Sequence, residues 1–354
     1  MPLKLDQNAR FPLFGSYETT PYNIHTPEVS SWNLSIQRQI AADWLASASY
    51  IGSQAVHMWV QKPLNPAVYM PGGPCVLNGT TYNPCSTIGN TNQRRRLNLE
   101  RPQEGLSYGI LDEFDDGGTQ SYNAVLLSVQ SRASHGVTVS GNYTLSHCIG
   151  DYGDTNGTGP SAGSSFLDPN NRDFDRGNCD SDRRHIFNLM AVGETPRFAD
   201  PTLRALATGW RVSGIYRKST GSYLTILTGS DQALNGIGGQ RPNKVLADPY
   251  LDKSARPLTR YINPAAFALP VLGTLGTMGR ASVRGPGSWQ FDAALSKEFR
   301  FRETQKLEFR AEAYNVLNSF RPGNPVTALN SPIFGQIINA LDPRIMQFAL
   351  KYVF

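Results

Sequence analysis

The sequence predicts an all-β chain, a segment of an antiparallel transmembrane β-barrel, and three observations lead to this class. Apolar and polar residues alternate at period two in nine stretches, as in strands with one apolar face. Short and long connections alternate between those stretches. The last stretch ends on an aromatic residue, Phe354, without a polar tail, whereas the termini of soluble domains usually fray into solvent.

The composition is compatible with this class. Of the 354 residues, 40% are hydrophobic, 33 are glycine and 24 are proline, and helical periodicity is rare. No stretch approaches the roughly 18 to 20 apolar residues that a membrane helix needs. The formal net charge is +5, and the only basic run is 94–96. This run lacks interleaved aromatic residues, so we interpret it as a solvated loop and expect no nucleic-acid partner.

The nine stretches define the predicted strands. The clearest is 137–146, in which every second residue is polar. Two strands carry a charge on the apolar face, Arg38 and Lys297, near the ends that lead into short turns. We expect these long side chains to snorkel to lipid headgroups. In chain order the predicted strands are 32–40, 44–51, 120–131, 137–146, 185–193, 210–216, 289–301, 307–314 and 346–354.

The connections are long at only one end of the strands. Outer-membrane barrels have short periplasmic turns and long extracellular loops, whereas nothing forces this asymmetry on a soluble sandwich. We predict short turns at 41–43, 133–136 and 302–304, a medium connection at 194–208, and long polar loops at 61–118, 150–182, 229–287 and 318–342.

Two further features concern the loops and the strand ends. The loop residues 150–182 and 229–243 are interpreted as surface material, and 106–114 as part of a local hairpin within the first long loop. Four tryptophans stand near predicted strand ends, as an interfacial girdle requires, although tryptophan also favours strands in general. They are Trp32, Trp44, Trp210 and Trp289.

Four cysteines lie in or beside two of the long loops. Neither pair has the CxxC spacing of a zinc site, and disulfides are permitted outside the cytoplasm. Sequence alone allows three pairings, and a reduced chain is the alternative. Pairing within each loop is the economical choice, which joins Cys75 to Cys85 and Cys148 to Cys179.

No catalytic constellation emerges from the sequence. The five histidines show no HExxH spacing and no GxSxG motif is present, so we expect no enzyme and no cofactor, with a barrel-borne Ser–His hydrolase as the alternative. One oxygen-rich cluster has ligands suited to calcium but departs from the EF-hand pattern, so we interpret it as solvated loop acids and expect no metal. It comprises Asp168, Asn170, Asp173 and Asp175.

Two sets of strand residues carry specific expectations. Glu308, Arg310 and Glu312 alternate along one strand and are expected to face the lumen. There they pair with one another and with neighbouring strands, or else contact a plug or a solute; the satisfied lumen wall is the preferred interpretation. The terminal strand presents a continuous apolar face for outer-membrane lipid, formed by Met346, Phe348, Leu350, Tyr352 and Phe354.

Several stretches together carry a family resemblance: 31–38 with 49–53, 142–148, 182–188, 309–318 and the terminal strand. In their order and spacing they resemble the carboxy-terminal half of a TonB-dependent outer-membrane transporter. The subtype is Oar-like, with an amino-terminal carboxypeptidase-regulatory-like domain. The resemblance implies a 22-stranded barrel, an enclosed plug and energy supplied through TonB. It also implies that the barrel assembly machinery recognises the terminal strand.

We therefore expect residues 1–354 to be the carboxy-terminal part of such a barrel, with about 9 to 11 of its strands, in the cell outer membrane. We expect the signal peptide, the carboxypeptidase-regulatory-like domain and the plug to be absent from this chain. We expect a fragment that takes part in uptake of a solute, with the missing plug and amino-terminal barrel half as partner and TonB reached only through that part. The alternative is a soluble or surface-anchored β-rich adhesin or lectin-like binding protein.

Overall fold

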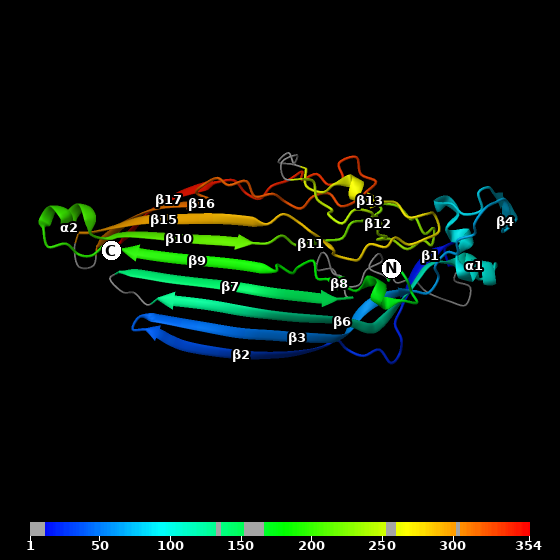
Figure 1. The fold of residues 1–354 in the computed structure, drawn as a ribbon, viewed down its shortest axis with the longest axis horizontal. Helices are drawn as coiled ribbons and strands as arrows, with labels where there is room; N and C mark the ends of the chain where they lie inside the picture. Colours follow the sequence, from blue (N-terminus) through cyan, green and yellow to red (C-terminus); the bar gives the residue numbers. More distant parts are fainter. Residues whose placement is uncertain (1–10, 132–135, 152–165, 253–259, 302–304) are drawn as a thin grey trace.

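The computed structural model describes residues 11–131, 136–151, 166–252, 260–301 and 305–354, and these form one long curved sheet with loops gathered beyond one end (Figure 1). The main sheet has 11 strands, nine of which follow the order β17-β16-β15-β10-β9-β7-β6-β3-β2. Those nine are β2 (Glu28–Ala41), β3 (Trp44–Pro63), β6 (Tyr108–Ser131), β7 (Val137–Gly150), β9 (His185–Glu194), β10 (Trp210–Ser219), β15 (Ser288–Arg300), β16 (Lys306–Tyr314) and β17 (Ile345–Val353).

The remaining elements are short. β1 (Gly15–Thr19) pairs in parallel with β6, and β8 (Gly177–Asn178) pairs with β7. Six more strands form separate pairs in the loops: β4 (Cys75–Leu77) with β5 (Thr80–Tyr82), β11 (Tyr223–Leu224) with β14 (Val283–Arg284), and β12 (Asn243–Lys244) with β13 (Phe267–Ala268). The α-helices are α1 (Arg96–Glu100) and α2 (Pro201–Ala207), with 3-10 turns η1 (Ile88–Asn90), η2 (Asn92–Arg94), η3 (Gly105–Ser107), η4 (Arg172–Asp175) and η5 (Pro264–Ala266). Within the described ranges no helix is long and apolar enough to cross a membrane.

Each of the nine predicted strands is present, and each path strand pairs antiparallel with its neighbours. The prediction of a local hairpin containing 106–114 is wrong, because residues 108–114 are the beginning of β6. The hairpin of this loop is β4–β5 instead. The lengths of β3 and β6 were underestimated. The parts of these strands that extend past the end of β2 contain irregular pairings, which interrupt the alternation of apolar and polar residues.

The register places the apolar sides of the nine strands on one continuous outer face. Ile36 lies opposite Ala48, Ala48 opposite Leu127, and Leu127 opposite Tyr143. These side chains are not covered by protein: Ile36 is 65% exposed and Leu127 46%. Contiguous apolar surface on this scale is not stable in water, so this face requires an apolar surrounding.

The buried apolar core lies in the loops and not between sheet layers. Its residues come from the connection after β10 and, for Phe334, from the connection after β16: Leu224, Ile226, Ile262, Ala266, Phe267, Met278, Val283 and Phe334. The interpretation of the loops as surface material is therefore wrong in part. Phe166 and Leu167 in the loop after β7, and Leu234 and Ile237 in the loop after β10, are buried as well. Glycine-rich and polar composition concealed this core because its apolar residues are scattered singly along the loops.

The two ends of the sheet differ in the connections that the structure describes. β2 and β3 are joined by the two residues between Ala41 and Trp44, whereas β3 and β6 are joined by 64–107. The predicted turns at 133–136 and 302–304 lie outside the described residues except for Gly136. Trp44 and Trp210 are the first residues of their strands at the short-turn end. Trp32 and Trp289 stand toward the loop end, so the four tryptophans flank the apolar band.

The sheet is not closed. Among the described residues β2 pairs only with β3, and β17 pairs only with β16. Both outermost strands thus present backbone N–H and C=O groups that have no strand beside them, which is costly in an apolar medium.

The structure corrects the expectation that Lys297 snorkels to headgroups. Its side chain is only 2% exposed, and its ammonium donates hydrogen bonds to the carbonyl oxygens of Thr208 and, at 3.2 Å, Leu206. The ammonium also lies 5.2 Å from the ring centroid of Trp210. Lys297 therefore binds the carboxyl-terminal end of α2, where a helix leaves carbonyl groups without partners. Arg38, by contrast, is exposed.

Replacing Lys297 with methionine is expected to loosen the connection 195–209. A hydrogen bond to a charged group contributes about 1.5 to 3 kcal/mol, so α2 should open more often and be cleaved faster by protease. Limited proteolysis followed by mass spectrometry measures the rate. Lys244→Met, at an exposed lysine in the loop at the opposite end of the sheet, is the control. Equal cleavage of both variants would contradict the role assigned to Lys297.

Candidate functional site

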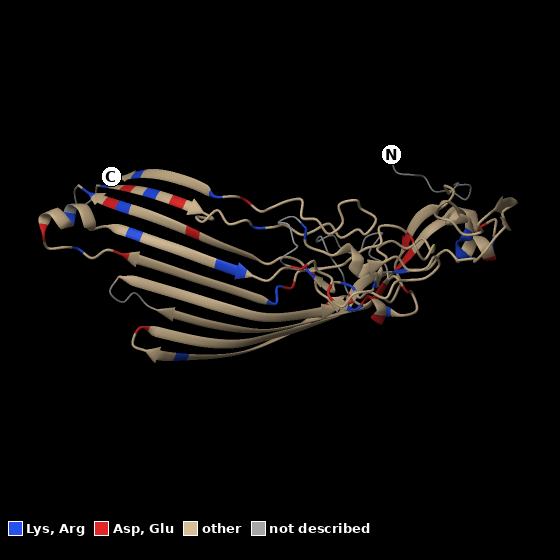
Figure 2. Cartoon of the chain, turned by 45° about the horizontal axis from the view of Figure 1, so that its top comes forward, with Lys and Arg blue, Asp and Glu red and all other residues tan. Residues whose placement is uncertain are grey.

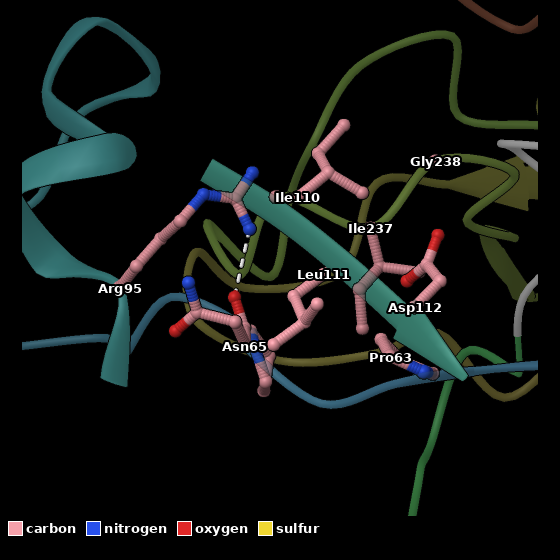
Figure 3. A pocket seen from close by; sticks show the side chains of 10 residues that line it. Pro63, Asn65, Arg95, Ile110, Leu111, Asp112, Ile237 and Gly238 are labelled. Atoms are coloured by element: carbon pink, nitrogen blue, oxygen red, sulfur yellow. Dashed lines mark hydrogen bonds between the residues drawn. The ribbon is translucent and has the colours of Figure 1, made fainter. Parts of the chain in front are cut away.

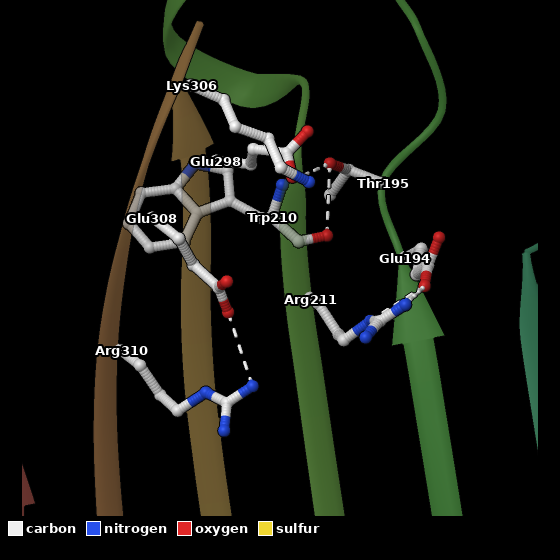
Figure 4. Close-up of polar contacts among 8 residues, drawn as sticks. All are labelled: Glu194, Thr195, Trp210, Arg211, Glu298, Lys306, Glu308 and Arg310. Carbon is white, nitrogen blue, oxygen red and sulfur yellow. Dashed lines mark hydrogen bonds and ion pairs between the residues drawn. The ribbon is translucent and has the colours of Figure 1, made fainter. Parts of the chain in front are cut away.

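The inner face of the sheet carries the predicted polar row. Arg310 contacts two acidic residues on its own strand. Its Nη2 lies 3.2 Å from Oε1 of Glu308 (Figure 4), and its Nη1 lies 3.4 Å from Oε1 of Glu312. On the next strand, Glu298 pairs with Lys306 at 2.9 Å. The three residues proposed to face the lumen are therefore brought together as one chain of ion pairs.

Charges on the inner face are unevenly distributed. They gather on β10, β15 and β16, whereas β7 contains no Asp, Glu, Lys or Arg (Figure 2). Arg211 of β10 is paired with Glu194 of β9 across the strands (Figure 4). Because these pairs are partly exposed to solvent, each contributes about 1 kcal/mol or less to stability. The wall is thus polar and largely self-paired, which suits a water-filled lumen.

The loop layer beyond the strands contains arginines that the sequence interpretation placed in solvent. Arg94 is fully buried and Arg95 is 6% exposed. Arg94 donates to the backbone oxygens of Val68 at 2.6 Å and Leu234 at 2.8 Å. The prediction of a solvated basic run is therefore wrong for these two residues and holds only for Arg96, which forms an exposed pair with Glu100.

These buried guanidinium groups hold loops from different parts of the chain together. Burial lowers the pKa of Arg94, and the charge of Asp231 partly offsets this effect. Burial likewise lowers the pKa of Arg95, against the charges of Asp112 and Asp231. An arginine stays protonated through such shifts, so both remain cationic links between loops.

The oxygen-rich cluster that the sequence led us to interpret as solvated loop acids is divided among different contacts. Asp175 forms a buried ion pair with Arg241, whose Nη1 lies 2.5 Å from Oδ1, and its other oxygen accepts a 2.8 Å hydrogen bond from the Leu167 backbone. Arg241 also donates to the Met278 carbonyl at 2.7 Å. Asp175 is thus neither a solvated acid nor an available cation ligand. The other three residues lie in the same segment, where Asp168 accepts from the Asn170 backbone at 3.0 Å.

A second arginine reinforces this junction. Arg280 donates to the carbonyl oxygens of Asp175 at 2.8 Å and Gly150 at 2.6 Å. Burial lowers its pKa, partly offset by Asp180 and Asp175. The junction therefore connects the loop after β7 to the loop after β10. No motif in the sequence predicts this junction, because Asp175 lies 66 residues from Arg241 and still farther from Arg280 in the chain.

Two adjoining pockets open among these loops. The smaller, of about 180 Å³, is lined by residues including Pro63, Arg95, Asp112 and Ile237, and Arg95 donates a 2.8 Å hydrogen bond to the Asn65 carbonyl beside it (Figure 3). The larger, of about 600 Å³, is lined by residues including Lys62, Tyr69, Arg96, Asp168 and Asn170. This second volume lies within the usual range for small-molecule sites.

Both disulfides follow the expected pairing within loops. Cys75 is bonded to Cys85 and Cys148 to Cys179. The first closes the β4–β5 hairpin region, and the second joins the end of β7 to the segment after β8. A disulfide stabilises mainly by restricting the unfolded chain, so both bonds favour an ordered loop layer.

Comparison with known proteins gives a consistent result. A family profile described as an outer membrane beta barrel domain matches residues 2–347. No curated protein sequence matches significantly. The solved outer membrane transporter YddB from Escherichia coli matches with a TM-score of 0.51 and 12% identity over 96% of this chain and 34% of that one.

A second solved structure is the ferric-catecholate import receptor Fiu from Escherichia coli K12 in its closed form. It matches with a TM-score of 0.41 and 12% identity over 98% of this chain and 30% of that one. The chain thus spans about a third of the length of these two proteins. At this identity the match to YddB shows a shared fold.

Proposed function

The chain belongs to the outer membrane beta barrel domain family and lies in the cell outer membrane, and from this premise we propose that it is the solute-binding wall and loop layer of an outer-membrane transporter. The observation that carries the proposal is the pair of pockets at the loop end of a sheet with an apolar outer and a polar inner face. A solute arriving from outside meets these pockets before it meets the lumen.

The open sheet supports the second part of the proposal. A barrel in lipid must close, since each unsatisfied backbone group in hydrocarbon costs several kcal/mol. The free sides of β2 and β17 are the two places where further strands add. We propose that strands of a larger TonB-dependent barrel, with its plug, complete the structure there, and that TonB acts through that added part.

The terminal strand fits a role in assembly. Met346, Phe348, Leu350 and Tyr352 share the outer face, opposite residues of β16 such as Ala311 and Phe309. We propose that the barrel assembly machinery recognises this aromatic and apolar edge. The adhesin or lectin alternative is less well supported, because a soluble protein rarely exposes a continuous apolar face that extends over nine strands.

Uptake is tested in cells that carry the complete natural gene. Deleting the gene should abolish depletion of at least one small solute from the medium, measured by mass spectrometry, and wild-type complementation should restore it. Lys62→Ala, at the larger pocket, should slow depletion at low solute concentration with an unchanged amount of protein in the membrane. Lys244→Ala, in the loops but not lining either pocket, should behave as wild type.

The same cells distinguish the alternative. If the protein is released from membranes by alkaline carbonate and no solute depends on the gene, the transporter proposal fails and the adhesin is favoured. If the protein resists carbonate but depletion is unchanged, the barrel stands and uptake by it does not.

A further inference from the structure

Three side chains from separate segments converge at the loop end of the sheet, outside the pockets described above. His25 precedes β2, His57 belongs to β3 and Asp116 to β6. One ligand atom from each lies within 4.8 Å of the others. Their intervals in the sequence follow no metal-binding motif, so the group could not be recognised from the sequence.

Two opposed β-bulges bring His57 and Asp116 to this place. Between Ala55 and Met58, β3 carries one more residue than β6, and His57 lies in that step with a φ of 57°. In the following step β6 carries the extra residue, and Asp116 lies there. A bulge redirects a side chain out of the normal alternation, and a positive φ is uncommon for histidine. Both distortions aim the two side chains toward His25.

His25 is held from both sides of its backbone. Its N–H donates to Oδ2 of Asp116 at 2.8 Å, and its carbonyl accepts from Nε1 of Trp59 at 2.6 Å. The ring is also positioned, since Nδ1 lies 2.6 Å from the same Asp116 oxygen and the ring centroid lies 4.8 Å from that of His57. Without a cation, these contacts keep the His25 ring beside both Asp116 and His57.

We propose that His25, His57 and Asp116 bind a divalent transition-metal cation of the Zn²⁺ type. Two imidazoles and a carboxylate are ligands that Zn²⁺, Ni²⁺ and Cu²⁺ accept, whereas Ca²⁺ and Mg²⁺ prefer oxygen alone. Metal–ligand bonds of about 2.0 to 2.2 Å place tetrahedral ligand atoms roughly 3.4 Å apart. Nδ1 of His25 and Oδ2 of Asp116, now 2.6 Å apart, would have to separate by a little less than about 1 Å, and ligand atoms as far as 4.8 Å apart would have to approach by a little more than about 1 Å. Such a shift is within reach because the His25 side chain is exposed.

The bound cation would have a structural consequence. It ties the segment before β2 to β3 and β6, so the outermost strand becomes anchored at its loop end. Three protein ligands also leave at least one coordination position open to solvent, since His25 lies at the surface.

Zn²⁺ binding to the full-length protein in detergent micelles, carrying no histidine tag, tests the proposal by calorimetry. The wild type should bind one Zn²⁺ per chain, and His25→Gln should abolish saturable binding. His57→Asn should weaken it at least tenfold; asparagine tolerates the positive φ, so the bulge is preserved. Asp116→Asn should also weaken it at least tenfold.

His185→Gln is the matched control, because this histidine hydrogen-bonds Tyr143 on another strand and is not in the group. It should bind Zn²⁺ as the wild type does. A second readout follows from the structural role: Zn²⁺ should slow protease cleavage in 20–27 in the wild type but not in His57→Asn. Absence of Zn²⁺ binding to the wild type, or unchanged binding by His57→Asn, overturns the proposal.

Discussion

Replacing Arg241 with methionine is expected to open the loop layer while leaving the barrel strands intact. The change leaves the Asp175 carboxylate buried without its partner and removes donors from the carbonyls of Phe174 and Met278. Breaking one side of a buried ion pair costs about 3 to 5 kcal/mol. The amide of Leu167, which donates to Asp175, should therefore exchange its hydrogen faster by roughly two to three and a half orders of magnitude.

The double variant Arg241→Met/Asp175→Leu tests whether the cost comes from the uncompensated charge. Replacing both partners by apolar residues removes the buried carboxylate, so most of the protection should return at loop amides that do not donate to Asp175. The amide of Met278, which donates to the Pro242 carbonyl at 3.1 Å, is such a reporter. Strand amides, for example in β7, serve as the internal control and should be unaffected in both variants. If the double variant exchanges as fast as the single one, the carbonyl hydrogen bonds of Arg241 matter more than the ion pair.

Placing an arginine on the outer face is expected to impair folding into membranes. Leu127 is 46% exposed on this face, near the middle of the part of β6 that pairs with both β3 and β7. A lipid-facing arginine at the bilayer midplane of a barrel costs about 2 to 4 kcal/mol. Leu127→Arg should therefore lower the folded fraction in lipid vesicles at denaturant concentrations where the wild type is half folded.

The adjacent residue supplies the matched control. Ser128 lies on the inner face, where its hydroxyl is 2.6 Å from that of Ser47. Ser128→Arg adds the same charge to the same strand but directs it toward the lumen, so the cost should be below about 1 kcal/mol. A soluble β-protein predicts the opposite order, because Leu127 would face water. Equal effects at the two positions would contradict the assignment of the faces.

The strands and their faces were predictable because the information is local. Alternation at period two identifies a strand and its apolar side without knowledge of its neighbours. In a membrane barrel every strand has this same pattern, because each strand has one side toward lipid. The terminal face from Met346 to Phe354 and the row Glu308, Arg310 and Glu312 could both be assigned in this way. The register then brought each strand's apolar side onto one surface.

The errors arose where a side chain's partner lies far away in the sequence. In the sequence, Arg94 resembles a solvated loop residue. Only folding brings it to its partner Leu234, which lies 140 residues away in the chain. Lys297 is near a strand end, as snorkelling requires. Only the tertiary structure shows that the carbonyl groups at the end of α2 lie within hydrogen-bond distance of its ammonium group. Asp175 belongs to an acidic cluster in sequence and to an arginine junction in space.

The sequence by itself thus determined the all-β class, the position of each strand along the chain, and which side of each strand is apolar. These properties depend on short-range alternation and on the solvent outside the sheet. Only the tertiary structure decided which loop arginines are buried, where the pockets lie, and how His25, His57 and Asp116 meet. Those depend on strand register, on bulges and on contacts between loops, which join residues as much as 140 positions apart and therefore leave no periodic signal in the chain.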